Sequence, residues 1–448
     1  MANARATFTE GRVARHILVM TSTIALSLLA VFLVDILTLV YVAKLHDPVL
    51  LAAVGIAKVL IFFNGAIASG FIIAAASVLS ERISERETPG FARLTGSLML
   101  MVMIASGLTA AVQLALVFPV THMLGADDVT YPVVRSFIWL TLPFTVAQSA
   151  MQMSAQILRT TGDSRRALWV VLSGAATLAV ADPLFIFVLG LGIKGAGLAY
   201  ALSAVVSASL GAFWLRKRVG LLFSTDWALL REHMRVTFKI ALPAIVANLA
   251  TPVGLAYLFS SLAAYGTSTL AAMAVVDRVM QFAYCAFFSL PTALAPVLGQ
   301  NIGARRDDRV GTAIVFTRRL VVAYGLAVWG VLILSSGLIA DLYELEGPGR
   351  AMFVAFCQIG GGLWAIIGLD FVAISVFVTM DRSWLVAAFA WARATLAAVP
   401  FIYVGTHLFG GSGALPGMFA GNALIAIISI FTASLTAKRF FQRRAQPA

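Results

Sequence analysis

The chain has few charged residues and almost no cysteine, and each shortage excludes a class of protein. Asp, Glu, Lys and Arg make up 12% of its 448 residues, whereas about 25% is typical of soluble globular proteins. Its two cysteines, Cys285 and Cys357, both lie inside apolar segments, so we expect no disulfide framework. The sequence contains no H-E-x-x-H, Walker A or G-x-S-x-G motif, and its five histidines form no metal-binding pattern. We therefore predict that the protein is not an enzyme and holds neither a cofactor nor a metal.

Long apolar runs fill most of the chain instead. The sequence is 60% hydrophobic and its mean hydropathy is +0.94. A membrane-spanning helix needs about 20 apolar residues, and twelve segments meet that length. They lie near residues 17–43, 49–79, 92–120, 136–158, 167–190, 195–215, 239–263, 269–298, 315–340, 351–379, 384–408 and 415–437. The first run is longer than a cleavable signal, and no A-x-A site follows it, so we expect it to be retained. The predicted fold is an all-α integral membrane protein with twelve transmembrane helices.

Basic residues predict the orientation of these helices. Of the 32 lysines and arginines, 25 lie at the chain ends and in every second connection, and four lie in the other connections. The positive-inside rule then places both termini in the cytoplasm of a multi-pass protein of the inner (plasma) membrane. The net charge of +12 is thus a topology signal, and we predict no nucleic-acid partner.

The second half of the sequence repeats the first. LLAAVGIAKVL begins at Leu50 and TLAAMAVVDRV at Thr269, 219 residues later, and VLSERIS and VLGQNIG keep this offset. Six helices per half give both halves the same orientation, as in transporters built from parallel repeats. We predict two pseudo-symmetric six-helix lobes, 1–218 and 239–448, joined by a cytoplasmic linker at 219–238, with a transport site that alternates between the two sides of the membrane.

Four motifs resemble the multidrug and toxic compound extrusion (MATE) family. They are Asp35 followed by LLAAVGIA, the turn TTGDSRRAL, the segment ADPLFIFVLGLGIKGAGLAYA at 181–201, and LAPVLGQNIGARRDDR at 294–309. The resemblance favours the proton-coupled bacterial branch. It implies a monomeric efflux antiporter that exports small organic cations or drugs in exchange for protons, with sodium less favoured, and that contacts membrane lipid. The alternative is a lipid-linked oligosaccharide or lipid flippase of the same superfamily.

Two carboxylates in the first half are candidate proton-binding groups. At about 1.5 Å per helical residue, Asp35 lies about 13 Å, and Asp182 about 18 Å, below the basic residues at the outer ends of their helices. A charge inside a membrane is costly and usually functional. Two adjacent carboxylates at similar depth cannot easily both stay ionised, so the pair is suited to hold a proton. The alternative is that each aspartate is merely paired or caps a helix kink.

The resemblance also bears on the choice between protons and sodium. Leu178, Tyr200 and Met20 stand where the proton-coupled branch usually has asparagine, threonine and proline. The sodium-coupled branch uses acids in helices 7 and 10. Here Thr251 replaces the first of these, and Asp370 remains in helix 10 as a further coupling candidate. A single acid is a poor sodium site, so we favour protons.

The remaining polar residues of the spans are candidates for other roles. Lys58 and Asp277 occupy equivalent positions of the repeat, which suggests an ion pair between the lobes. Pairing of Lys58 with Asp35, or of Asp277 with Arg278, is the alternative. Gln148 and Gln152 share one face of helix 4 and either line a cavity or bond neighbouring helices. The candidates for the substrate cavity are Asn64, Gln148, Gln152, Tyr200, Asn248, Thr251 and Gln281.

Overall fold

The computed structural model describes residues 7–83, 89–123, 127–223 and 226–445, and every regular element within these ranges is helical. Helices are expected because backbone polar groups in lipid must be bonded within their own segment. Nine of the described helices are long and apolar enough to cross a membrane, or ten if one bent pair counts as a single span. The segment from Thr130 to Thr160 adds one span to these ten. Gly410 divides the helical run that ends at Arg444 into two spans, which completes the twelve predicted spans. The predicted all-α membrane fold is confirmed.

The helices group into two compact units. The amino-terminal unit contains Ser22–Ala241 with the described residues before Gly11, and the carboxy-terminal unit contains Gly11–Thr21 and the chain from Leu242 onward. The first helix therefore contributes residues to both units. The predicted lobe boundaries stay a prediction, and residues 227–238 of the predicted linker form the start of a long helix.

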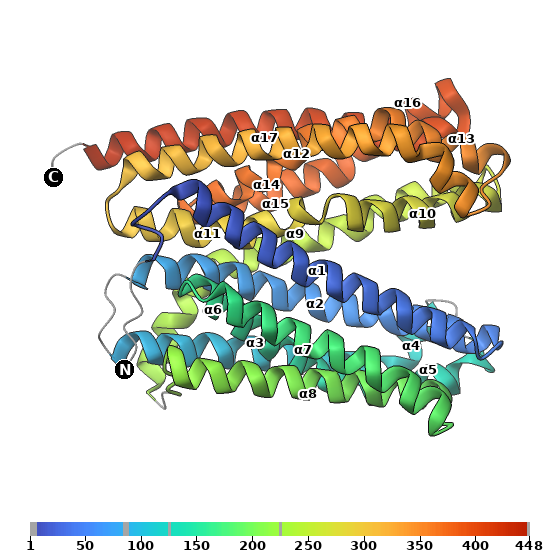
Figure 1. Cartoon of the computed structure of the whole chain (residues 1–448), viewed down its shortest axis with the longest axis horizontal. Helices are drawn as coiled ribbons and strands as arrows, with labels where there is room; N and C mark the ends of the chain where they lie inside the picture. The colour runs from blue at the N-terminus through green and yellow to red at the C-terminus, as the bar shows by residue number, and fades with distance from the viewer. Residues whose placement is uncertain (1–6, 84–88, 124–126, 224–225, 446–448) are drawn as a thin grey trace. The chain divides into compact units, whose positions relative to one another are not determined.

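Helices α7 and α8 run side by side in the amino-terminal unit (Figure 1). Small residues allow this close approach, since the Ser203 hydroxyl donates to the Gly174 carbonyl at 2.9 Å. Gly211 likewise lies against Ser154, which brings α6 onto α8. The helices of this unit are α1 (Val13–Ala43), α2 (Pro48–Arg82), α3 (Pro89–Ala115), α4 (Val117–Met123), α5 (Thr130–Thr141), η2 (Leu142–Phe144), α6 (Thr145–Thr160), α7 (Ser164–Pro183), η3 (Leu184–Val188), α8 (Gly192–Arg218) and the start of α9 (Trp227–Ala263).

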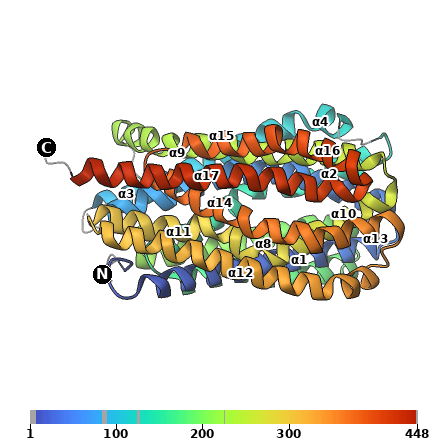
Figure 2. The ribbon, with the colours of Figure 1, turned by 90° about the horizontal axis from the view of Figure 1, so that it is seen from above.

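Helix α14 is the central element of the carboxy-terminal unit. It packs against α11, α12 and α17, and Figure 2 shows it next to α17. Tyr284 stacks on Trp364 and donates to the Gly361 carbonyl at 2.9 Å, so aromatic contacts tie α14 to the bend before α11. The remaining helices are α10 (Thr267–Ala283), α11 (Cys285–Gly303), α12 (Asp307–Leu342), α13 (Gly347–Ala355), η4 (Phe356–Gly360), α14 (Gly361–Thr379), α15 (Trp384–Ala392), η5 (Arg393–Ala397), α16 (Ala398–Phe409), η6 (Gly410–Gly413) and α17 (Ala414–Ala445).

Aspartates in the connections begin several helices. The side chains of Asp47, Asp163 and Asp226 accept hydrogen bonds from backbone N–H groups in the first turns of α2, α7 and α9. Such caps satisfy donors that a helix cannot bond internally. Asp127 accepts from the Thr130 backbone at 2.7 Å, and hydrogen bonds from Thr130 hold the pKa of Asp127 below its ordinary value.

Two prolines mark changes of helix type inside predicted spans. Pro143 lies in η2, a 3₁₀ turn that separates α5 from α6. Pro183 ends α7 and is followed by the π-helix η3, in which the Leu189 N–H bonds the Leu184 carbonyl at 2.9 Å. A proline removes one backbone donor and so permits such local changes. The change at Pro183 comes directly after the candidate residue Asp182.

Candidate functional site

Asp35 and Lys58 lie together in the amino-terminal unit. Asp35 is in α1 and Lys58 in α2, and the Lys58 Nζ atom lies 4.0 Å from Asp35 Oδ1. The same ammonium donates to the backbone carbonyl of Asp35 at 3.4 Å. The side chain of Asp35 is 49% exposed and that of Lys58 is 35% exposed, so this is a half-buried ion pair. One alternative raised by the sequence, pairing of Lys58 with Asp35, is therefore present in the structure.

Asp182 is the buried member of the predicted carboxylate pair. It lies at the end of α7 and is fully buried. The hydroxyl of Thr38, one turn after Asp35 on α1, donates to Asp182 Oδ2. The other carboxylate oxygen, Oδ1, has no hydrogen-bond partner among the described residues. A single side-chain donor from α1 therefore holds a carboxylate at the end of α7.

The two aspartates and Lys58 form one electrostatic cluster. Both Asp35 and Lys58 lie close enough to Asp182 to act on its carboxylate by Coulomb interaction. Asp35 acts in the same way on Tyr200 of α8. The Tyr200 hydroxyl is buried and has no hydrogen-bond partner in the described part of the chain. The predicted residues Asp35, Asp182 and Tyr200 are thus brought together with Lys58 within one unit.

Asn64, a cavity candidate, is 1% exposed in a buried polar network. Its Nδ2 donates to the Ser106 carbonyl at 3.0 Å, and the Ser106 hydroxyl donates to its Oδ1 at 2.6 Å. The Ser149 hydroxyl donates to that of Ser106 at 3.1 Å. The network joins α2, α3 and α6, and Asn64 bonds neighbouring helices here.

The other cavity candidates occupy more open positions. Gln148 and Gln152 of α6, and Asn248 of α9, are half-buried. Thr251 of α9 is exposed, and Gln281 of α10 donates to Asp277 on its own helix at 2.6 Å. Their role in substrate binding stays a prediction.

Asp277 belongs to the carboxy-terminal unit and Lys58 to the amino-terminal unit. Each has a partner within its own unit, Gln281 for Asp277 and Asp35 for Lys58. The ion pair predicted between Lys58 and Asp277 stays a prediction.

Asp370, the third coupling candidate, is buried in α14 and 2% exposed. Its Oδ2 forms an ion pair with the Nη1 of Arg393 from η5. Arg393 falls within the predicted span 384–408, and its pairing with Asp370 was not predicted. Opposite charges in consecutive spans were the available signal.

Two further polar residues of the amino-terminal unit were missed by the sequence reasoning. Thr38 was overlooked, although a hydroxyl one turn after a membrane aspartate is a readable signal. Arg159 of α6 is 7% exposed; its Nη2 donates to the Ser27 hydroxyl at 3.3 Å, and its Nε has no hydrogen-bond partner among the described residues. Its position at the end of a span had suggested only a topology signal.

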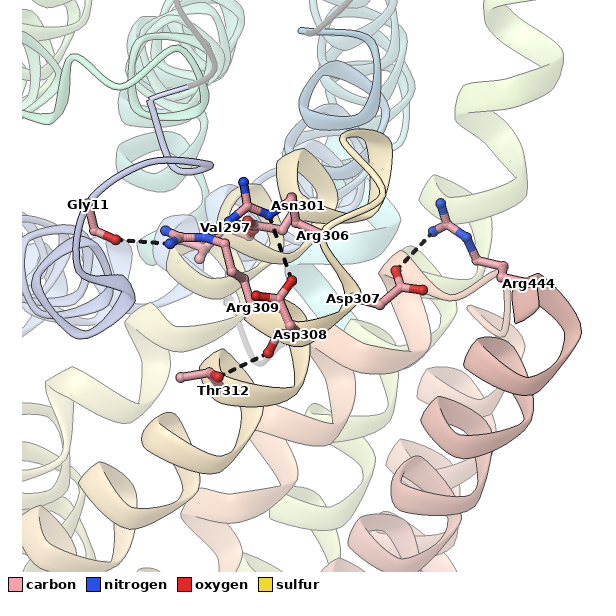
Figure 3. A network of polar contacts seen from close by, with 9 residues as sticks. All are labelled: Gly11, Val297, Asn301, Arg306, Asp307, Asp308, Arg309, Thr312 and Arg444. Atoms are coloured by element: carbon pink, nitrogen blue, oxygen red, sulfur yellow. Dashed lines mark hydrogen bonds and ion pairs between the residues drawn. The ribbon is translucent and has the colours of Figure 1, made fainter.

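The LAPVLGQNIGARRDDR motif forms a polar network at the junction of α11 and α12 (Figure 3). Arg309 donates from Nε to Asn301 Oδ1 and from Nη1 to the Gly11 carbonyl, both at 3.0 Å. Asn301 in turn donates to the Val297 carbonyl at 2.7 Å. Arg444 of α17 lies 3.7 Å from Asp307, which starts α12. The motif therefore ties the start of α12 to α17 and to the segment before α1.

No group of three or more His, Cys, Asp and Glu side chains within the described ranges is arranged to hold a metal ion. The candidate site is thus one of paired charges on adjacent helices.

The MatE family profile matches the chain twice, at residues 23–184 and at 243–404. The two matches begin 220 residues apart, in agreement with the offset of the sequence repeat. The FAD transporter of Shewanella oneidensis is 22% identical over 342 residues, which cover 75% of each chain. The multidrug export protein MepA of Staphylococcus haemolyticus is 21% identical over 295 residues, covering 65% of this chain and 64% of MepA.

A solved structure shares the fold over nearly the whole length. The crystal structure of the Vibrio cholerae MATE transporter VcmN in the bent form has a TM-score of 0.89 at 20% identity, and covers 95% of this chain and 97% of VcmN. Because the family profile matches more than half of the chain, the protein belongs to the MatE family, the multidrug and toxic compound extrusion transporters.

Proposed function

We propose that the protein is a secondary active antiporter of the inner membrane that exports organic cations or drugs in exchange for protons. Membership of the MatE family supports export, and the multidrug export protein MepA among the relatives supports drugs as substrates. Coupling to protons is supported by one observation above all, the cluster of Asp35, Lys58 and Asp182 in the amino-terminal unit.

The charge of this cluster suits an exchange reaction. With both aspartates ionised and Lys58 protonated, the three groups carry a net charge of −1. One proton, or one monovalent organic cation nearby, is sufficient to neutralise it. A net charge inside a membrane is costly. The unit therefore favours binding either the proton or the organic cation and disfavours binding both at once. Proton entry from outside would then release the substrate, and substrate uptake from the cytoplasm would release the proton.

The proposal is tested by transport of a fluorescent organic cation in proteoliposomes with an imposed proton or sodium gradient. We expect the proton gradient to drive transport by the wild type and an equal sodium gradient to be ineffective. Asp35→Asn and Asp182→Asn remove one carboxylate each, and both should lose most of the proton-driven transport. Asp341→Asn is the matched control, because Asp341 lies at the end of α12, is exposed, and is paired with Arg350.

Normal proton-driven transport by Asp35→Asn would show that this carboxylate does not couple the two fluxes. Transport driven by sodium alone, and unaffected by both variants, would place the coupling ion elsewhere in the chain.

An anionic substrate is the second candidate, and Arg159 is the observation that favours it. This arginine is buried in the amino-terminal unit with no carboxylate paired to it among the described residues. The relative from Shewanella oneidensis is a FAD transporter. The same proteoliposomes, loaded with FAD or with the cationic dye, separate the two candidates. Export of FAD that is lost in Arg159→Gln, with no dye transport, would favour the anion.

A further inference from the structure

The carboxy-terminal unit contains one buried carboxylate among its described residues, that of Asp370. The second acid within its spans, Asp277, is exposed and bonded to Gln281 of its own helix at 2.6 Å. Asp370 instead receives the guanidinium of Arg393, which comes from the next span along the chain. A buried carboxylate needs a compensating charge, and here that charge is covalently part of the protein.

The backbone around Arg393 is shaped to present this side chain. Arg393 begins η5, a five-residue π-helix between α15 and α16. Such single-turn expansions occur frequently at functional sites. A Cβ added to Gly254 of α9 would lie 3.3 Å from Ala394 Cα, and the Trp391 indole donates to the Val246 carbonyl at 3.0 Å. Contacts with α9 on both sides of Arg393 therefore hold this turn in place.

The pair is not saturated by hydrogen bonds. Arg393 Nη1 contacts Asp370 Oδ2, whereas Oδ1 is buried and has no hydrogen-bond partner in the described part of the chain. A guanidinium remains protonated at any physiological pH, so its charge cannot leave the site by deprotonation. The carboxylate is thus neutralised by a fixed cation and retains one oxygen able to bind another positive group.

We propose that Arg393 is a tethered cation that takes the place of a small monovalent ion such as Na⁺ at Asp370, and that it thereby determines the ion specificity of the carboxy-terminal unit. While the guanidinium is present, a second cation at Asp370 would meet a positive charge in a buried site. When the guanidinium is removed, the carboxylate is left buried and uncompensated, and a small cation is its simplest partner. The inference depends on the proposed antiport only for its consequence, which is that sodium does not drive transport.

Ion-specific thermal stabilisation of the purified protein tests the proposal without requiring transport. The unfolding midpoint Tm is measured in NaCl, KCl and choline chloride at one ionic strength. We expect no sodium-specific change in the wild type. Arg393→Ala should gain a saturable sodium-specific rise in Tm of about 2–5 °C, because a ligand that binds only the folded state stabilises it.

Three variants separate the tethered charge from a structural role of the side chain. Arg393→Lys retains a positive charge and should show no response to sodium. Arg393→Gln removes the charge but keeps a shorter polar side chain, so it should respond as the alanine variant does, and it replaces the alanine variant if that variant fails to fold. The double variant Asp370→Asn/Arg393→Ala lacks both charges and should not respond.

A sodium-specific rise in Tm of the wild type that disappears in Asp370→Asn would overturn the proposal, and this arm needs no arginine variant. A folded Arg393→Ala or Arg393→Gln protein whose Tm is the same in all three salts would also overturn it. Absence of proton-driven transport by the wild type would contradict the proposed function. It would leave the Tm measurements, and what they say about Arg393, unchanged.

Discussion

At the scale of single residues, many hydroxyls in the described spans bond the backbone of their own helix. Thr109 donates to the Ala105 carbonyl at 2.8 Å, and Thr317 donates to that of Ala313 at 2.7 Å. This local bonding lets a polar residue lie in an apolar helix without a partner on another helix. Thr38 differs, because its hydroxyl also reaches Asp182 on α7. The difference makes Thr38 the residue at which the carboxylate cluster can be perturbed without removing a charge.

Replacement of Thr38 by valine should destabilise the protein through Asp182. Valine has a similar shape but no hydroxyl, so the buried carboxylate would lose its side-chain donor. Leaving a buried acceptor unsatisfied costs about 1–3 kcal/mol of the free energy of unfolding. We expect a lower Tm for Thr38→Val in detergent at neutral pH, whereas Thr38→Ser keeps the donor and should unfold near the wild-type Tm. Equal Tm values for the two variants would contradict the role assigned to this hydroxyl.

At the scale of elements, α16 and α17 approach each other through glycines. A Cβ added to Gly405 would lie 3.3 Å from Gly417 Cα, and one added to Gly417 would collide with the Phe401 carbonyl. Backbone atoms cannot move aside as the end of a flexible side chain can. The two helices can therefore pack at this distance only while these positions lack side chains, as in other closely packed membrane helices.

Gly417→Ala should separate α16 from α17 and lower the stability of the folded protein. Overpacking of this kind costs about 1–3 kcal/mol. Gly330→Ala is the matched control, since Gly330 also lies within a long helix, α12, and has nothing within 4 Å of an added Cβ. That substitution should raise the free energy of unfolding by about 0.5–1 kcal/mol, because alanine is the better helix former. Thermal unfolding in detergent compares the two, and a Gly417→Ala protein as stable as Gly330→Ala would refute the close contact.

The sequence predicted the helices better than their contacts, and lipid is the reason. An apolar run long enough to cross a bilayer forms a helix whatever its neighbours are, so the spans could be read from hydropathy alone. Which faces meet depends on side-chain shape, which hydropathy does not contain. The pairing of Asp370 with Arg393, the donation from Thr38 and the π-helices η3 and η5 therefore became visible only in three dimensions. The carboxylates themselves were predictable because a charge in a span is rare.

At the scale of the whole molecule, the distribution of basic residues carries the orientation in the membrane. Most lysines and arginines gather at one set of helix ends, and this asymmetry predicts that both termini are cytoplasmic. The fourth span, α5 to α6, is suited to a test because exposed residues flank it, Asp128 on the predicted outer side and Arg165 on the predicted cytoplasmic side.

Cysteine labelling at these two positions should report the orientation directly. The native Cys285 and Cys357 are 5% and 0% exposed, so they should react little with a membrane-impermeant maleimide in the folded protein. In intact cells the reagent should label Asp128→Cys and spare Arg165→Cys, and in everted vesicles the reverse is expected. Labelling of both variants after solubilisation in detergent provides the control for reactivity. If Arg165→Cys reacted in intact cells while Asp128→Cys did not, both termini would lie outside. Export would then require substrate to enter at the face with few basic residues and to leave at the face that carries most of them.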